Sequence, residues 1–356
     1  MKMDVLSSMH IESSEVIQLV KRMYKALIIA LCMLLLILDT KTAVTGAVNG
    51  INLCIRVLIP SLFPFLLISI LLTDLLSGTS SVILRPLGRL LKIPVGSESI
   101  FLVGMIGGYP VGAQIISQSA EKGILTNRDA ERMMQFCNNA GPAFLFGVIS
   151  QQFPDRVYTW LIWIIIILST MLTAAILPGS SDKEVSINAP KPMKLTQAME
   201  KSMKVMAGIC GWVMIFRVIL AFLERWFLWM LPDIPRVAIQ ILLELANGCT
   251  VLNEIQSIGL RFIISTAGLC IGGFCVLLQT LSVSGTIGIG KYIQGKLLQT
   301  GISILLAIPV VFLLENGMSP FITAGIATIF IPILVILSNY RKKHKIKYGI
   351  SLSGSV

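Results

Sequence analysis

The chain has 356 residues, of which 55% are hydrophobic and only 13% charged, and its mean hydropathy is +0.84. A soluble domain carries roughly a quarter charged residues, so this composition excludes an ordinary soluble protein and predicts a helical protein that crosses a membrane several times. A net charge of +11 would suggest nucleic acid in a soluble chain. Here the basic residues stand beside apolar runs, as the positive-inside rule describes, so we expect no nucleic-acid partner.

The first apolar run, Met23–Leu38, follows a basic cluster at residues 21–25. Its length is marginal for a membrane span, so it is either the core of a signal peptide or a retained anchor. Further spans follow and no small-residue cleavage site is visible, which favours the anchor. We therefore predict a cytoplasmic lead and first anchor over residues 1–41. A basic tail over residues 340–356 completes a charge pattern that places both termini in the cytoplasm.

The next stretch, residues 42–76, is amphipathic at first and then apolar, and Pro60 and Pro64 lie inside it. Proline removes a backbone donor and clashes with the preceding turn, so we expect an interrupted helix there. Val157–Leu177 is by contrast the cleanest span in the chain.

A polar linker over residues 178–197, rich in Ser, Pro and charges, divides the chain in two. We predict a first half over residues 42–177. The second half covers residues 198–339 and includes the closing spans Ile302–Leu314 and Phe321–Leu337.

Two interrupted apolar runs lie close together in the first half. Ile100–Ile116 reads IFLVGMIGGYPVGAQII, and Phe136–Gly147 reads FCNNAGPAFLFG. Backbone groups freed by such breaks must be satisfied by protein or by water in a cavity when they lie at membrane depth. Between the runs, Thr126 and Asp129 predict a helix start in the style of a capping box. Broken or re-entrant helices that border a polar site are the pattern of many transporters.

The second half repeats this pattern of breaks. Ile239–Ile255 holds Glu244 and Asn247 among apolar residues, and Ala267–Gly290 is a long apolar run with internal glycines and Gln279. Repeats of this kind commonly bracket a substrate site near the middle of the bilayer. The predicted fold is an all-α polytopic membrane protein of about 8–10 hydrophobic helices, built from two repeats that contain broken or re-entrant helices.

Glu244 is the strongest candidate for a functional side chain, because an ionisable group inside a span is costly unless it is paired or hydrated. The alternative is a structural ion pair with Arg217 or Arg56. Asn247 is expected on the same helix face as Glu244. Asn138 and Asn139 either contact a polar or carboxylated ligand or join helices at the break. The candidate substrate-binding residues are Gly107, Gly108, Tyr109, Pro110, Gly112, Asn138, Asn139, Gly141, Glu244, Asn247 and Gln279.

Motifs for catalysis or nucleotide hydrolysis are missing from the sequence. It holds no P-loop, no HExxH, no GxSxG and no dinucleotide fingerprint. The two histidines, His10 and His344, lie near the termini, and the seven cysteines read as small core residues without metal-ligand spacing. We therefore expect no enzyme activity, no metal and no cofactor, and any transport would be secondary, facilitated or driven by a partner.

The run GMIGGYPVGAQIISQSAEKGILTNRDAERMMQFCNNAGPAFLFGVI resembles the signature of the YlbJ (SpoVV) sporulation integral membrane proteins, which carry a nucleoside-recognition or Gate domain. The family's Gly-Tyr/Phe-Pro-x-Gly-Ala pattern is met at Gly108–Ala113, its acidic/Arg helix at Ala130–Arg132, and its Asn-x-x-Pro-x-Phe pattern at Asn139–Phe144. Looser matches at Leu243–Gly248 and around Gln279 extend the resemblance, which covers roughly residues 42–314.

This resemblance implies two Gate-like repeats and a place in the membrane of a spore-forming Gram-positive bacterium. It implies movement of dipicolinic acid toward the forespore, across the mother-cell-derived outer forespore membrane. Distant similarity to concentrative nucleoside transporters leaves a nucleoside-like solute as an alternative, and a non-transporting membrane assembly factor of sporulation as another. The expected partners are a small-molecule solute and the lipid bilayer, with a coupling cation or proton and association with itself or other sporulation proteins left open.

Overall fold

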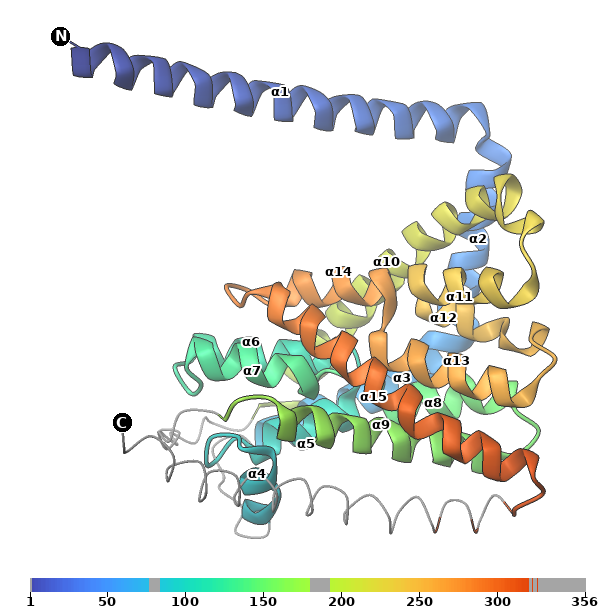
Figure 1. Ribbon diagram of the computed structural model, residues 1–356. Helices are drawn as coiled ribbons and strands as arrows, with labels where there is room; N and C mark the ends of the chain where they lie inside the picture. Colours follow the sequence, from blue (N-terminus) through green and yellow to red (C-terminus); the bar gives the residue numbers. More distant parts are fainter. Residues whose placement is uncertain (1, 77–83, 180–192, 320–321, 323–324, 326–356) are drawn as a thin grey trace, which may run out of the picture.

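The computed structural model describes residues 2–76, 84–179 and 193–319, together with residues 322 and 325 (Figure 1). The described residues form helices and no β-strand. Among the described residues, five helices are long and apolar enough to cross a membrane, which confirms an all-α polytopic membrane protein. They cover Thr40–Leu72, Arg156–Ile176, Leu195–Trp226, Ile258–Val283 and Ile289–Glu315. The predicted closing span Phe321–Leu337 and the basic tail fall outside the described residues.

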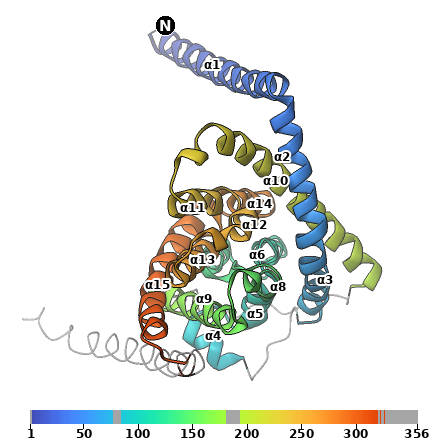
Figure 2. The same cartoon turned by 90° about the vertical axis from the view of Figure 1, so that its right-hand side faces the viewer.

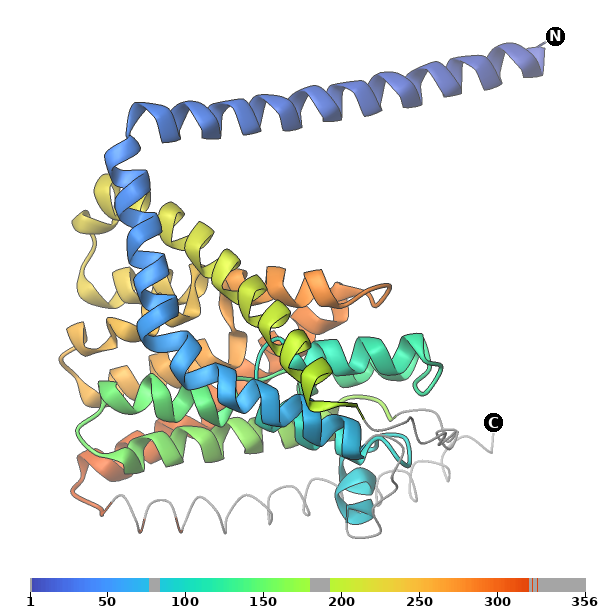
Figure 3. The same cartoon turned by 180° about the vertical axis from the view of Figure 1, so that it is seen from behind.

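Helix α1 (Lys2–Leu38) runs away from the bundle and meets it at its C-terminal end, beside α2 (Figures 1 and 3). It is not among the five helices that meet the length and hydropathy requirements for a span. Cys32, on α1, is exposed. The prediction that all seven cysteines are core residues is therefore wrong for this one.

The expected interruption at Pro60 and Pro64 is wrong. Helix α2 (Thr40–Leu53) passes through a π-helical turn at Cys54–Leu58 and continues as α3 (Ile59–Leu76), with Pro64 inside it. A π turn shifts the hydrogen-bond pattern by one residue, and here it does so directly before Pro60, which has no N–H to donate.

Helix α10 (Leu195–Trp226) packs antiparallel against α2 on one side of the bundle (Figures 2 and 3). The contact depends on small residues, because a side chain on Gly46 would come within 2.9 Å of the backbone of Val218, and one on Gly50 within 2.9 Å of Met214. Such close approach of backbones is typical of helix pairs in lipid.

Helices α5 (Glu98–Gly107) and α6 (Val111–Glu121) form a re-entrant pair. A side chain on either Gly104 or Gly112 would overlap the carbonyl of Cys137, so both arms lie against the same point of the next element. The chain therefore turns back at Gly108, whose φ of +74° favours glycine.

Helix α7 (Asn127–Cys137) begins at an N-cap formed by Thr126, as predicted. It is followed by an extended segment and by α8 (Pro142–Gly147), so α7 and α8 form one broken crossing. Helix α9 (Arg156–Ile176) runs antiparallel to this crossing, because Arg132 bonds to the carbonyl of Ala174 at one end and Phe146 packs on Trp160 at the other.

In the second half, the first interrupted element is another re-entrant pair, formed by α11 (Asp233–Leu243) and α12 (Leu245–Thr250). The chain is extended at Glu244 and doubles back, so that Gly248 lies directly on the backbone of Ile241. Glu244 and Asn247 consequently do not share one helix face, and that prediction is wrong.

Helix α13 (Ile258–Ile271) and α14 (Gly273–Val283) form the second broken crossing, interrupted at Gly272. Helix α15 (Ile289–Glu315) runs antiparallel to it, since Gly259 lies against Glu315, and parallel to α7. The parallel direction follows from three contacts of α15 with α7 and the break after it, which join Glu131 to Lys291, Gln135 to Gly295, and Asn139 to Lys296.

Because α15 runs with one broken crossing and against the other, the two crossings have opposite directions in the bundle. Each half thus contains a long helix, a re-entrant pair, a broken crossing and a closing span, and the halves are inverted with respect to each other. Inverted repeats with broken helices are a common architecture of secondary transporters.

The close approach at Gly248 gives a stability prediction. Gly248→Ala places a methyl group on the backbone of Ile241, and we expect a loss of about 1–3 kcal/mol or more in the free energy of unfolding. The matched control is Gly211→Ala in α10, where the added carbon meets open space. Thermal unfolding of the purified protein in detergent measures both, and equal midpoints for the two variants would contradict the doubled-back geometry.

Candidate functional site

The breaks of the two halves meet around a small cavity of about 60 Å³. They pack in pairs, since a side chain on Gly108 would come within 2.9 Å of the backbone of Gly141, and one on Gly273 within 2.8 Å of that of Leu242. Tyr109 joins the halves, because its hydroxyl lies 3.1 Å from the carbonyl oxygen of Leu269. The cavity therefore lies where four interrupted elements come together.

Both the candidate residues and apolar side chains form the wall of this cavity. Six candidates line it: Gly107, Gly108, Tyr109, Gly141, Glu244 and Gln279. Helices α3, α8, α10 and α14 contribute the apolar side chains Leu62, Phe144, Ile209, Val213 and Val276. Ligand pockets usually enclose about 300–1,000 Å³, so this cavity has room for a few water molecules.

Glu244 is 2% exposed and caps α12 with its carboxylate. Its two oxygens accept the backbone N–H groups of Ala246, at 3.0 Å, and of Asn247, at 2.5 Å. The alternative ion pair with Arg217 is not formed, because that guanidinium pairs with Glu224 at 2.7 Å. The carboxylate is thus held by a helix N-terminus on one side and faces the cavity on the other.

Asn138 does not reach the cavity. Its side-chain oxygen accepts the backbone N–H of Ala113 at 3.3 Å, and its amide donates to Thr280 at 3.0 Å and to Tyr292 at 3.4 Å. These bonds connect α6, α14 and α15 to the first break. Asn138 therefore joins helices, which is one of the structural roles predicted for it.

Asn139 lies in a second buried polar network. Its oxygen accepts hydrogen bonds from Lys296 Nζ at 2.9 Å and from Gln299 Nε2 at 2.8 Å, and Gln299 also donates to Thr170 at 2.9 Å. Its own amide donates to the carbonyl of Phe136 at 2.6 Å. The network connects α7, α9 and α15 behind the cavity wall.

Lys296 is a functional candidate that the sequence analysis missed. It is 2% exposed, and its ammonium bonds only to neutral oxygens among the described residues, those of Asn139 and Gln299. It also lies 5.3 Å from the ring centroid of Tyr109, which lines the cavity. A lysine inside an apolar helix is itself a signal of function, but Lys296 lies outside the interrupted segments that contain the other candidates.

Of the other candidates, Gly112 packs beneath Asn138, and Asn247 contributes its backbone to Glu244. Pro110 follows a cis peptide bond and lines a larger outer pocket. Gln279 is buried, and its amide donates to the sulfur of Cys275 at 3.3 Å. Among the described residues, no three His, Cys, Asp or Glu side chains gather as a metal site requires.

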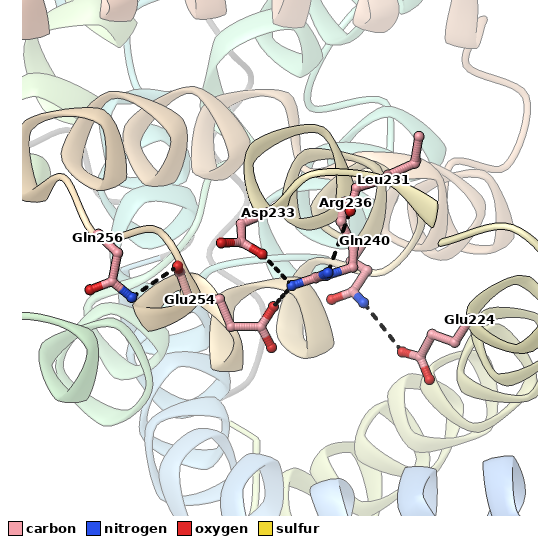
Figure 4. A network of polar contacts seen from close by, with 7 residues as sticks. All are labelled: Glu224, Leu231, Asp233, Arg236, Gln240, Glu254 and Gln256. Atoms are coloured by element: carbon pink, nitrogen blue, oxygen red, sulfur yellow. Dashed lines mark hydrogen bonds and ion pairs between the residues drawn. The ribbon is translucent and has the colours of Figure 1, made fainter. Parts of the chain in front are cut away.

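A polar network outside the cavity fixes the open end of the second re-entrant pair (Figure 4). Arg236 on α11 donates to Asp233 at 2.6 Å and to Glu254, just after α12, at 2.9 Å. Gln240 donates to Glu224 on α10 at 3.3 Å. The two arms of the pair are thus tied to each other and to a spanning helix, so the tip at Glu244 is held from its base.

Over 107 residues the chain is similar to the sporulation integral membrane protein YlbJ of Bacillus subtilis (strain 168), at 29% identity. The match takes in 30% of this chain and 26% of that protein, so the chain spans about a quarter of the relative's length. No protein-family model matches the chain, and no solved structure does either. The chain is thus a multi-pass membrane protein with distant similarity to a sporulation membrane protein, and the Gate domain stays a prediction.

Proposed function

We propose that the protein is a membrane transporter of a small anionic solute and that the inner cavity is its solute site. The observation that carries this proposal is the meeting of two inverted re-entrant pairs at a buried cavity that contains Glu244 and Gln279. Broken helices at the bilayer midplane are used in transporters to present helix ends and backbone groups to solute and coupling ion. No catalytic step is part of the proposal.

The charges around the cavity support a carboxylated solute that moves with a cation or proton. Lys296 supplies a buried positive charge, and Tyr109 contacts both that ammonium and the cavity. Glu244 supplies a negative charge at the cavity wall, so it must take up a proton or a cation when an anion binds beside it. An enlarged cavity, with Tyr109 displaced, would bring a solute carboxylate to Lys296.

Dipicolinic acid is the solute we propose first. It is small and carries two carboxylates, and the similarity to a sporulation membrane protein supports a role at this stage of the cell's life. The membrane would then be the mother-cell-derived outer membrane of the forespore, and the direction of movement would be toward the spore.

The test combines the cell and the purified protein. Spores from a strain lacking the gene are expected to contain little dipicolinic acid even when it is supplied externally. The purified protein in lipid vesicles is expected to take up labelled dipicolinate, with no uptake by empty vesicles. Normal spore content together with no uptake would overturn the proposal, and uptake of uridine instead would replace the anion by a nucleoside-like solute.

A further inference from the structure

A larger pocket, of about 400 Å³, opens beside the inner cavity between α6, α10 and α14. Its polar lining comes from all three helices and includes Gln114, Gln118, Lys201, Lys204 and Ser282. Among its described lining residues there are two lysines and no carboxylate. This composition suits a small anion.

The outer pocket shares part of its wall with the inner cavity. Ile209 and Gln279 line both spaces, and Pro110 of the outer pocket directly follows Tyr109 of the inner one. Gln279 is 5% exposed, and the hydrogen bond that its amide donates goes to a thiol sulfur, a weak acceptor. A thin partition of side chains, with an amide in it, therefore separates the two spaces.

One lysine of the outer pocket is positioned by a contact between two helices. Lys201 Nζ donates to Gln118 Oε1 at 2.9 Å, which joins the outer end of α6 to the first turns of α10. Ser117 and Glu121 on α6 in turn approach Gly285, just beyond α14. The ends of α6 and α14 and the start of α10 therefore lie together at one end of the bundle (Figure 1).

Among the described residues outside α1, that end of the bundle carries more lysine and arginine than the opposite end. The basic residues near it are Arg85, Arg89, Lys92, Lys122, Arg128, Lys194, Lys201, Lys204 and Lys291. At the opposite end they are Lys41, Arg156, Arg225, Arg236 and Arg261. By the positive-inside rule the end with the outer pocket faces the cytoplasm.

From these observations we infer that the outer pocket is a cytoplasmic antechamber, where Lys201 and Lys204 attract a small carboxylate anion before it passes Gln279 into the inner cavity. The inference rests on the proposed transport function and adds to it the route and the side of entrance. By this inference the solute must be negatively charged to bind first in the outer pocket and then in the inner cavity.

The charge is tested with the double variant Lys201→Gln/Lys204→Gln in vesicles that take up labelled dipicolinate. At about 0.01 M salt the initial rate is expected to fall roughly tenfold, and the difference should shrink at about 1 M salt, where charges are screened within about 3 Å. Lys194→Gln, which removes a charge from the same end outside the pocket, is the matched control and should change the rate less than twofold.

A second variant tests the space itself. Gly208 lines the pocket and an added side chain there meets open space, so Gly208→Trp fills the antechamber and is expected to block uptake at every salt concentration. Wild-type rates in both the double variant and Gly208→Trp would overturn the antechamber while leaving the transport function in place. Absence of uptake by the wild-type protein would overturn the proposed function and the antechamber together.

Discussion

Replacing Lys296 by methionine is expected to reduce uptake at least about tenfold, or ~1.4 kcal/mol, while the thermal stability stays unchanged or rises. The ammonium is buried against the neutral oxygens of Asn139 and Gln299. Removing a buried charge without an opposite partner relieves a desolvation penalty of several kcal/mol. The side-chain oxygen of Gln299 loses the hydrogen bond that Lys296 donates to it, at a cost of about 1–3 kcal/mol. The side-chain oxygen of Asn139 keeps the hydrogen bond that Gln299 donates. The relieved desolvation penalty offsets the lost hydrogen bond in the free energy of unfolding. No other group replaces the positive charge, so we expect the effect on uptake to remain.

The matched control is Lys291→Met, five residues earlier on the same helix, where the lysine is exposed and pairs with Glu131. This variant should keep its uptake. Uptake by reconstituted vesicles and thermal unfolding in detergent separate the two roles of Lys296. If Lys296→Met transports like the wild-type protein, the buried ammonium is a structural group and the positive charge of the proposed site lies elsewhere.

Glu244→Gln is expected to abolish uptake while the protein still reaches the membrane and folds. In the wild-type protein each carboxylate oxygen of Glu244 accepts one backbone N–H at the start of α12. The side-chain oxygen of glutamine can accept one of these N–H groups, but its amide nitrogen cannot accept the other. The loss of half a helix cap costs about 1 kcal/mol. The loss of the carboxylate removes the group that we propose takes up the coupling proton or cation.

Glu254→Gln is the control for this change, because Glu254 is an exposed carboxylate at the far end of the same re-entrant pair and bonds to Arg236. It should lower stability slightly and leave uptake intact. Glu244→Ala removes both acceptors, and its thermal midpoint should fall below that of Glu244→Gln. Full uptake by Glu244→Gln would show that Glu244 acts only as a helix cap and not in coupling.

The positions of the breaks were predictable because they depend on local chemistry. Several glycines with a proline stand close together at residues 107–112, and the Asn-Asn-Ala-Gly-Pro run does so at residues 138–142, and such clusters disfavour a continuous helix. The direction of the chain after each break was not predictable. It is decided by contacts such as those of Gly104 and Gly112 with the carbonyl of Cys137, which only the folded structure brings together.

The composition of the site was predictable only in part, for the same reason. Glu244 and Gln279 stand out in sequence because they are polar among apolar residues, and both line the cavity. Asn139 stands out equally, yet its partner Lys296 lies more than 150 residues away on a helix with no break nearby. Whether an amide faces a cavity or another helix depends on that partner. The continuous helix through Pro60 was not predicted, because a π-helical turn directly precedes this proline and the residue pattern does not indicate such a turn.

The inverted halves also relate the surroundings of the inner cavity by symmetry. A two-fold operation that exchanges the halves carries α6, α10 and α14, which enclose the outer pocket, onto α12, the α2–α3 helix and α8. Those three elements contribute Ala246, Leu62 and Phe144 to the wall of the inner cavity. For the transport that we propose, these three elements are the counterpart of the outer pocket on the other side of the inner cavity. Leu62 and Phe144 line the cavity from α3 and α8, whereas Gln279 lines it from α14, so the elements of one half contribute apolar side chains where those of the other contribute an amide.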